Sequence, residues 1–426
     1  MERERAGRKS ATVTQNRPRP TSMSEGSVHW QRNLYVCVFG SFTTLMAMTL
    51  LLPFLPIYVQ QLGATSVDAA VQWSGVAFGA TFLAAGLVAP LWGRLADRYG
   101  RKPILIRASL GMAITMSLLG LVQTVWQLVA MRFLAGLVGG YASGAIVMIA
   151  TQTPRHRTAW ALGTHAAGMM AGNLVGPLVG GLLPGLIGIR ATFFLAGGLI
   201  FCSFIMTTLL VKEERRTPDS ARTTPRGGWR DVPLLAPVFA MLASAMLLMF
   251  ANMSIEPIIT VYVAQLVDDP KKITLVAGVV MSAAALGSVL AAPRIGRLAD
   301  RVGAPKVIVG CLALCGVLLI PQIFVTNGTQ LVVLRFLMGL ALGGLLPAIT
   351  SVVRHNVPDH AAGYILGYAT SAQYIGQVTG PLAGGFIAAH SGMRSVFVMT
   401  SVLMFAGAAF NAWVFLRKQR ARETGA

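Results

Sequence analysis

Twelve long apolar segments dominate this sequence and limit what it can fold into. Many of them run for about 18 or more residues with almost no charge, the length that a helix needs to cross the hydrocarbon core of a bilayer. A hydrophobic content of 54% is also too high for an ordinary water-soluble chain of 426 residues. We therefore expect an all-α polytopic membrane protein with twelve transmembrane helices. Their expected ranges are 33–59, 70–92, 104–122, 126–150, 160–185, 190–211, 234–264, 273–295, 306–325, 329–352, 362–388 and 393–416.

The basic residues gather on one side of these spans. If both chain ends lie in the cytoplasm, 29 of the 35 Lys and Arg residues are cytoplasmic, four are external and two lie inside spans. This asymmetry is the positive-inside pattern, and it predicts cytoplasmic termini. The net charge of +20 is thereby explained by membrane topology, so we expect a lipid bilayer around the chain and no nucleic-acid partner. Residues 1–32 lack the core of a cleavable signal peptide and are expected to form a cytoplasmic tail.

The chain is an internal duplication. The hexapeptide GRLADR occurs at 93–98 and again at 296–301, and other motifs repeat at the same spacing of 203 or 204 residues. A unit of six spans is thus present twice, in one orientation, which is typical of transporters whose site lies between the halves. The expected organisation is a tail (1–32), a first six-helix bundle (33–211), a cytoplasmic linker (212–233), a second six-helix bundle (234–416) and a C-terminal tail (417–426).

The repeated hexapeptide belongs to the sequence GRLADRYGRKPIL, which joins the second and third spans. Its glycines are expected to allow tight turns. Asp97 and Asp300 are expected to dock at helix N-termini of the opposite half, because a helix dipole favours a negative charge there. They would form two latches on the cytoplasmic side; the alternative is a purely topological role for the positive charge. The motif residues are Gly93, Asp97, Arg98, Gly100, Arg101, Lys102, Gly296, Asp300, Arg301 and Gly303.

A second repeated motif, GNLVGPLVGG from Gly172, returns as GQVTGPLAGG from Gly376. Glycines four residues apart allow close helix packing, and the proline removes a backbone donor and bends the span. We expect this motif to seal one side of a cavity against proton leakage; the alternative is ordinary helix packing. Its residues are Gly172, Gly176, Pro177, Gly180, Gly181, Gly376, Gly380, Pro381, Gly384 and Gly385.

These motifs resemble those of the major facilitator superfamily (MFS), and more narrowly its twelve-span drug:proton antiporter branch. The span 2–3 motif, RFLAGLVGG from Arg132, LPFLPIY from Leu52 and the glycine-proline motif carry the resemblance, which covers residues 33–416. It implies the MFS fold of two pseudo-symmetric bundles, alternating access, and a part for Arg132 in proton transfer. The stretch IATQTPRHRTAWALG further resembles bacterial multidrug exporters, which implies a bacterial cytoplasmic (inner) membrane. Relatives often carry an acid at the cytoplasmic end of the fourth span, where this chain has MIATQTP, so the partner of Arg101 is open.

The candidate proton carrier is Glu256, the one acid of the fifteen that lies inside an expected span. Arg132 and Arg335 are expected at about the same depth, given a rise of about 1.5 Å per residue. An ionisable group in hydrocarbon is a functional candidate by default. We expect Glu256 to bind the transported proton beside Arg132 or Arg335; the alternative is a permanent ion pair with Arg335. His165 is a second candidate, with a helix-interface role as its alternative.

The expected substrate-cavity residues are Tyr58, Tyr262, Phe250, Asn252 and Met253, because soft apolar walls with an occasional amide suit varied amphipathic molecules. Packing is the alternative role for each of them. The leading prediction is proton-coupled efflux of small amphipathic or drug-like molecules by a monomer. The alternative within transport is a proton-coupled metabolite or sugar permease.

The sequence contains no phosphate-binding loop and no hydrolase or zinc-protease motif, so we expect neither an ATP-driven pump nor an enzyme. The four cysteines, Cys37, Cys202, Cys311 and Cys315, lie in expected spans without acid or His companions. No cofactor and no metal site are therefore expected.

Overall fold

The structure is a computed structural model that describes residues 29–213, 229, 232 and 235–423. The expected N-terminal tail as far as residue 28 and most of the expected linker lie outside these residues. The described elements are helical, with short 3-10 turns at Arg155–Arg157 and Pro270–Lys272. The α-helices are α1 Trp30–Leu50, α2 Leu55–Gln61, α3 Val67–Tyr99, α4 Arg101–Leu119, α5 Val125–Val138, α6 Tyr141–Gln152, α7 Thr158–Ile187, α8 Ile189–Leu210, α9 Leu235–Ala264, α10 Ile273–Val302, α11 Ala304–Gln322, α12 Gly328–Leu342, α13 Leu345–Asn356, α14 Asp359–Ser391 and α15 Met393–Glu423.

Eleven segments of the described chain are long and apolar enough to cross a membrane. The remaining expected span, 362–388, lies within α14, which has 33 residues. Its length suffices for a crossing, but Gln373, Gln377 and Thr379 lower its hydropathy. The described chain is therefore an all-α polytopic membrane protein, as the sequence predicts.

Three of the expected spans are each built from two consecutive helices. The first span is interrupted at residues 51–54, around Pro53, between α1 and α2. The fourth is interrupted between α5 and α6, where Gly140 adopts the left-handed conformation with φ of 102°. The tenth is interrupted between α12 and α13 at two glycines whose φ angles stay negative. Pro53 interrupts the first span because it lacks an amide donor, and Gly140 interrupts the fourth because glycine tolerates a positive φ.

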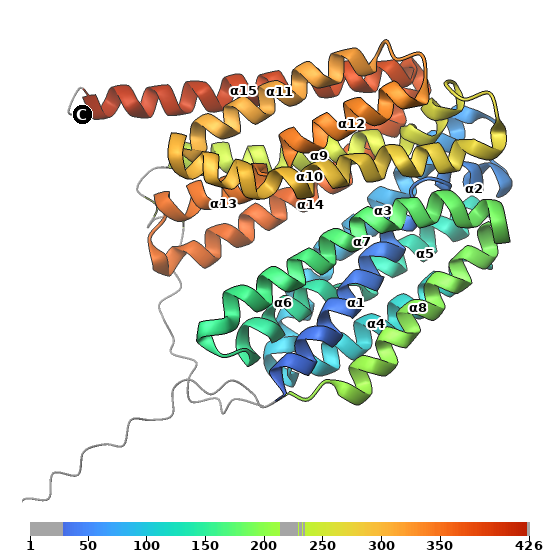
Figure 1. The fold of residues 1–426 in the computed structure, drawn as a ribbon, viewed down its shortest axis with the longest axis horizontal. Helices are drawn as coiled ribbons and strands as arrows, with labels where there is room; N and C mark the ends of the chain where they lie inside the picture. Colours follow the sequence, from blue (N-terminus) through green and yellow to red (C-terminus); the bar gives the residue numbers. More distant parts are fainter. Residues whose placement is uncertain (1–28, 214–228, 230–231, 233–234, 424–426) are drawn as a thin grey trace, which may run out of the picture.

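The helices form two bundles with the same internal pairing (Figure 1). In the first bundle α1 packs on α7, α3 on α5 and α4 on α8. In the second bundle the repeat-related pairs recur, with α9 on α14, α10 on α12 and α11 on α15. The sequence duplication is therefore matched by a duplication of helix packing.

The two bundles touch through two crossed pairs, α3 with α14 and α7 with α10. We name the end of the molecule that carries Trp30, Glu423 and both GRLADR repeats the terminal face, and the other end the opposite face. The bundles come together near α2 at the opposite face and diverge toward the C-terminal end of α15 (Figure 1). The crossed pairs close the opposite face, while the helix ends at the terminal face stand apart.

Both GRLADR hexapeptides are helical rather than part of a loop. Gly93 lies inside α3 and Gly296 lies inside α10. The turns are made instead by Gly100, with φ of 99°, and Gly303, with φ of 97°, and a new helix begins at the next residue. The expectation that Gly93 forms a turn is wrong, because an isolated glycine in a helix of 33 residues does not end it. Asp97 and Asp300 therefore lie on the last helical turns of α3 and α10.

Candidate functional site

A cavity of about 510 Å³ lies between the two bundles. Its wall is built from α1, α3, α5 and α7 of the first bundle and from α9, α10, α12, α13 and α14 of the second. Most of the wall is apolar, with methionines from both halves. The methionines that line it are Met48, Met170, Met249, Met253, Met281 and Met338.

Three charged residues share this cavity: Arg132 on α5, Glu256 on α9 and Arg335 on α12. These are the same three residues that the sequence predicts at about one depth in the membrane. Arg132 is fully buried, and none of its three guanidinium nitrogens has a hydrogen-bond partner within the described part of the chain. Its guanidinium carbon lies 4.9 Å from the centre of the Phe78 ring, which offers a cation–π contact. Arg132 therefore brings an uncompensated positive charge to the cavity wall.

Glu256 interacts electrostatically with Arg335 but is not held in a salt bridge with it. Ion pairs shorter than 4.0 Å in the described residues join Arg101 to Asp97 and Lys272 to Asp269, and neither pair includes Glu256. Arg335 donates a long hydrogen bond of 3.5 Å to the Met338 sulfur instead. In this conformation Glu256 lines the cavity and forms no ion pair with the described residues.

The two halves contribute different groups at the position of Glu256. Its repeat partner in the first half, Leu52, lies on the same cavity wall. A carboxyl group at one position and an aliphatic side chain at the other make the charge of the cavity asymmetric, although the helices around it are matched.

Two amide residues on the cavity wall, Asn173 and Gln377, were not anticipated from the sequence. Each follows the first glycine of the glycine-proline motif, so the two occupy matched positions of the duplication. The repeat alignment carries this signal, because a polar residue recurs at one position of an otherwise apolar motif. Asn252 and Met253, which the sequence does suggest, also line the cavity.

Tyr58, Tyr262 and Phe250, the other expected cavity residues, do not line it. The hydroxyl group of Tyr58 donates a hydrogen bond of 2.7 Å to the Leu119 backbone oxygen, and that of Tyr262 donates one of 2.8 Å to the Gln322 backbone oxygen. Both tyrosines are buried, and each packs on a phenylalanine of its own bundle. They act as matched structural ties, because a buried hydroxyl needs a partner and finds a helix end. Phe250 lies where the α9 backbone packs against α14.

His165 lies between α1 and α7, away from the cavity wall. It is buried, and its Nε2 atom is 2.7 Å from the Ser41 hydroxyl oxygen. This is the interface role that the sequence leaves open for it.

The glycine-proline motif packs the same way in both halves. In the first half Gly172, Gly176 and Gly180 face the backbone of α1, and in the second their counterparts face α9. The last glycine of each motif faces the other bundle. A Cβ atom at Gly181 would lie 3.1 Å from the Leu275 Cα atom, and one at Gly385 would lie 3.1 Å from the Val71 backbone oxygen. The motif thus packs against the first helix of its own half, which is α1 or α9. Its last glycine belongs to the contact between the bundles that closes the opposite face.

Among the described residues, neither Asp97 nor Asp300 forms an ion pair with the other bundle. Asp97 forms an ion pair with Arg101 one turn later, and its side chain is 71% exposed. Asp300 is also exposed. The expected latches between halves stay a prediction about a conformation in which the terminal face is closed.

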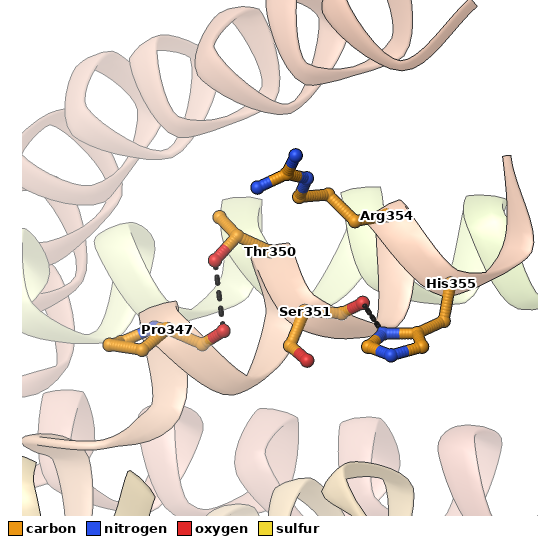
Figure 2. Close-up of a pocket in the computed structure, with 5 residues that line it drawn as sticks. All are labelled: Pro347, Thr350, Ser351, Arg354 and His355. Carbon is orange, nitrogen blue, oxygen red and sulfur yellow. Dashed lines mark hydrogen bonds between the residues drawn. The ribbon is translucent and has the colours of Figure 1, made fainter. Parts of the chain in front are cut away.

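A second hollow, also of about 510 Å³, lies along the terminal-face half of α13. Figure 2 shows the described residues that line it, Pro347, Thr350, Ser351, Arg354 and His355. Thr350 donates to the Pro347 backbone oxygen, and the His355 ring nitrogen Nδ1 is 2.8 Å from the Ser351 backbone oxygen. The next residue toward the helix break, Leu346, lines the central cavity. α13 thus lines this hollow and, through Leu346, the central cavity.

Comparisons with known proteins identify the family. The model of the Major Facilitator Superfamily matches residues 37–271 and 273–426. The multidrug resistance protein MdtG of Serratia proteamaculans is 40% identical over 92% of this chain and 95% of its own length. The protein of that name from Salmonella typhimurium is 41% identical over 94% of this chain and 99% of its own length.

Solved structures share the fold at low sequence identity. A bacterial homolog of the human lysosomal transporter Spinster, in an inward-facing and unoccupied conformation, gives a TM-score of 0.70 at 15% identity over 92% of this chain and 98% of its own. The human organic anion transporter MFSD10 gives a TM-score of 0.66 at 18% identity over 90% of this chain and 99% of its own.

Proposed function

The chain belongs to the Major Facilitator Superfamily, and we propose that it exports small amphipathic or drug-like molecules in exchange for protons. The observation that carries this proposal is the cavity between the two bundles, with one carboxyl group and two guanidinium groups on an otherwise largely apolar wall. Two relatives that match over nearly the whole chain are named multidrug resistance proteins, which supports the substrate class.

The terminal face is proposed to be cytoplasmic, in the inner membrane of a bacterium. The excess of Lys and Arg on this face supports the assignment, because basic residues are retained on the cytoplasmic side. With that orientation the conformation is inward-facing: the crossed contacts of α3 with α14 and of α7 with α10 close the external side. Export then requires the two bundles to rock about the cavity, so that the external side opens as the terminal face closes.

Glu256 is proposed to carry the proton. Arginine side chains stay protonated in proteins, so Arg132 and Arg335 cannot exchange a proton with solvent. Glu256 is the one carboxyl group on the described cavity wall and is the group there whose charge can change. In the cycle we propose, the carboxyl group takes up a proton when the cavity faces outward and releases it when the cavity faces inward. Substrate occupies the cavity during the opposite half of the cycle.

The wall suits amphipathic substrates. Methionine side chains are flexible and polarisable, and they adapt to ligands of different shape. Asn173, Asn252 and Gln377 add donors and acceptors for a polar substituent. We propose that a monomer carries out the whole cycle, because the cavity is assembled from the two halves of one chain.

Reconstituted vesicles test the proposal directly. The purified chain in liposomes, under an imposed proton gradient, should accumulate a fluorescent amphipathic dye, and an ionophore that collapses the gradient should stop accumulation. Gradient-driven transport of a sugar or another small metabolite, with none of the dye, would favour the permease function instead. Dye accumulation that ignores the ionophore would contradict proton coupling.

A further inference from the structure

Glu213, which is described at the start of the expected linker, forms a contact that none of the sequence motifs predicts. Its carboxylate accepts one hydrogen bond of 2.7 Å from the Arg101 backbone nitrogen and another of 2.8 Å from the Lys102 backbone nitrogen. These are the first two residues of α4, where unpaired amide groups and the helix dipole favour a negative charge. Both bonds are short, as charge-assisted hydrogen bonds are. A residue from the end of the sixth span thus caps the third span.

The chain around Glu213 is fixed in place. The Asn33 side chain donates a hydrogen bond of 2.7 Å to the Lys212 backbone oxygen and accepts one of 3.1 Å from the Lys212 backbone nitrogen. Val211 is fully buried in a cluster with Leu34 and Leu105. The residues just before Glu213 are thus anchored to α1 and α4, and they hold Glu213 in place at the start of the linker.

Two carboxylates therefore bind the same residue of the GRLADR region from different sides. The Arg101 guanidinium group pairs with Asp97, and the Arg101 backbone nitrogen binds Glu213. The fourth span ends in MIATQTP without an acid for the Arg101 side chain, and Glu213 is a carboxylate from another span that contacts the Arg101 backbone. The second half offers no such carboxylate. The positions that correspond to Glu213 are Leu416 and Arg417, and α11 has no acidic residue in its first turn.

We propose that Glu213 is a positioning residue for the terminal-face gate and receives the Arg101 guanidinium group when Asp97 leaves it. This inference rests on the proposed alternating-access function. In the inward-facing form Arg101 is neutralised by Asp97. When the terminal face closes and Asp97 docks on the other bundle, Arg101 loses that partner, and Glu213 is the carboxylate already fixed beside it. Without Glu213 the closed form would leave Arg101 unpaired.

The proposal predicts a direction for the conformational equilibrium. Removing the charge of Glu213 weakens its hydrogen bonds to the N-terminus of α4 in both forms. In the outward-facing form it also removes the carboxylate proposed to pair with the Arg101 guanidinium group. A change that affects two states unequally shifts their populations toward the less affected one. Glu213→Gln should therefore favour the inward-facing form. An exposed ion pair is worth roughly a 2- to 5-fold change in the ratio of the two forms.

Spin-label distances across the terminal face measure this ratio. Thr151 and His355 occupy matched positions of the repeat, on α6 and α13, and both are exposed. The labels would be placed there after replacement of the four native cysteines, with the full chain in nanodiscs. The labels are far apart in the inward-facing form, in which the terminal face is open. Glu213→Gln should raise the population with long distances roughly 2- to 5-fold. It should also lower the transport turnover, with an unchanged KM. Glu214→Gln is the matched control, since it removes the same charge one residue later, and it should change neither.

A second variant separates capping from the gate. A glutamine keeps one of the two oxygens that accept from the backbone amides of Arg101 and Lys102, whereas Glu213→Ala removes the charge and both acceptors. A long-distance population that rises in both variants supports the gate role. Distances in Glu213→Gln that match those of Glu214→Gln would overturn it and leave Glu213 as a helix cap alone. The distances report conformation without a substrate or a proton gradient, so they stand even if the proposed drug efflux fails.

Discussion

The two halves of this molecule share a scaffold but differ at two carboxylates, Glu256 and Glu213. Tyr58 and Tyr262 each donate a hydrogen bond to a backbone oxygen at a helix end of their own half. Both glycine-proline motifs pack on the first helix of their own half, α1 or α9. The matched positions of Glu256 and Glu213, by contrast, hold Leu52 and the Leu416–Arg417 pair. A duplicated chain keeps what both copies need for packing. The two carboxylates that occur in one copy alone are therefore the groups through which the halves can differ in function.

The helix breaks beside the cavity show the same contrast. In the first half the break after α5 is held by side chains: the Trp92 indole donates a bond of 2.8 Å to the Leu137 oxygen, and Arg107 donates one of 2.7 Å to the Val138 oxygen. The Arg107 guanidinium carbon also lies 3.4 Å from the centre of the Trp92 ring. In the second half the corresponding residues are Ile295 and Gly310, which have no side-chain donors. The first break is clamped, and the second bends at two glycines.

The largest expected effect comes from moving the cavity carboxyl group between halves. Glu256→Leu should reduce compound-driven proton exchange to the level of empty vesicles, because the wall then carries no group that changes charge. Adding Leu52→Glu should restore part of the exchange, since Leu52 lines the same cavity. Proton flux in reconstituted vesicles measures both variants. No recovery in the double variant would show that a carboxyl group supports proton exchange at position 256 in the second half but not at position 52 in the first.

The next largest effect should come from filling a glycine contact that both halves share. A Cβ atom at Gly180 would overlap the Leu50 backbone, and one at Gly384 would overlap the Ser254 backbone. Each Gly→Ala change should lower stability by about 1–3 kcal/mol through overpacking and slow transport. Gly185→Ala is the control, because no atom lies within 4 Å of its Cβ position. If Gly180→Ala and Gly384→Ala lowered the melting temperature by different amounts, the two glycine contacts would not be equivalent.

A smaller effect should separate the two GRLADR repeats. Asp97→Asn should reduce turnover roughly fivefold, because it removes the proposed latch and the present partner of Arg101. Asp300→Asn should cost less, since Asp300 forms no ion pair with the described residues. Both variants should still insert into the membrane, which immunoblots of isolated membranes would verify. Normal turnover with Asp97→Asn would reduce the first repeat to a topological signal.

The smallest effect should come from the clamp on the first helix break. Trp92→Phe keeps a ring beneath Arg107 but leaves the Leu137 oxygen without its donor. The expected loss of stability is about 0.5–1.5 kcal/mol, measured as a shift in thermal unfolding in detergent. Trp126→Phe, at an exposed ring of the same half, should be neutral. Equal shifts in the two variants would argue that the clamp contributes nothing specific.

The sequence predicts the scaffold well because apolar runs, repeats and charge asymmetry can be read from the order of the residues without knowing any contact. It also brings Arg132, Glu256 and Arg335 together, since depth in a membrane follows from counting residues along a helix. It fails where a long-range partner decides a role. The tyrosine hydroxyl groups are tied to helix ends, and the Glu213 carboxylate reaches a helix that begins 112 positions earlier. Asn173 and Gln377 could have been identified by comparing the two copies position by position.

The most direct test of proton transfer by Glu256 uses inside-out membrane vesicles with a pH-reporting dye. Wild type and Glu256→Gln would be compared at matched protein amounts, with a panel of amphipathic drugs added after the vesicles are energised. We expect a drug to trigger proton efflux in the wild type and none in the variant, because a glutamine side chain holds no exchangeable carboxyl proton. A drug response of equal size in both would contradict the assignment of the proton to Glu256.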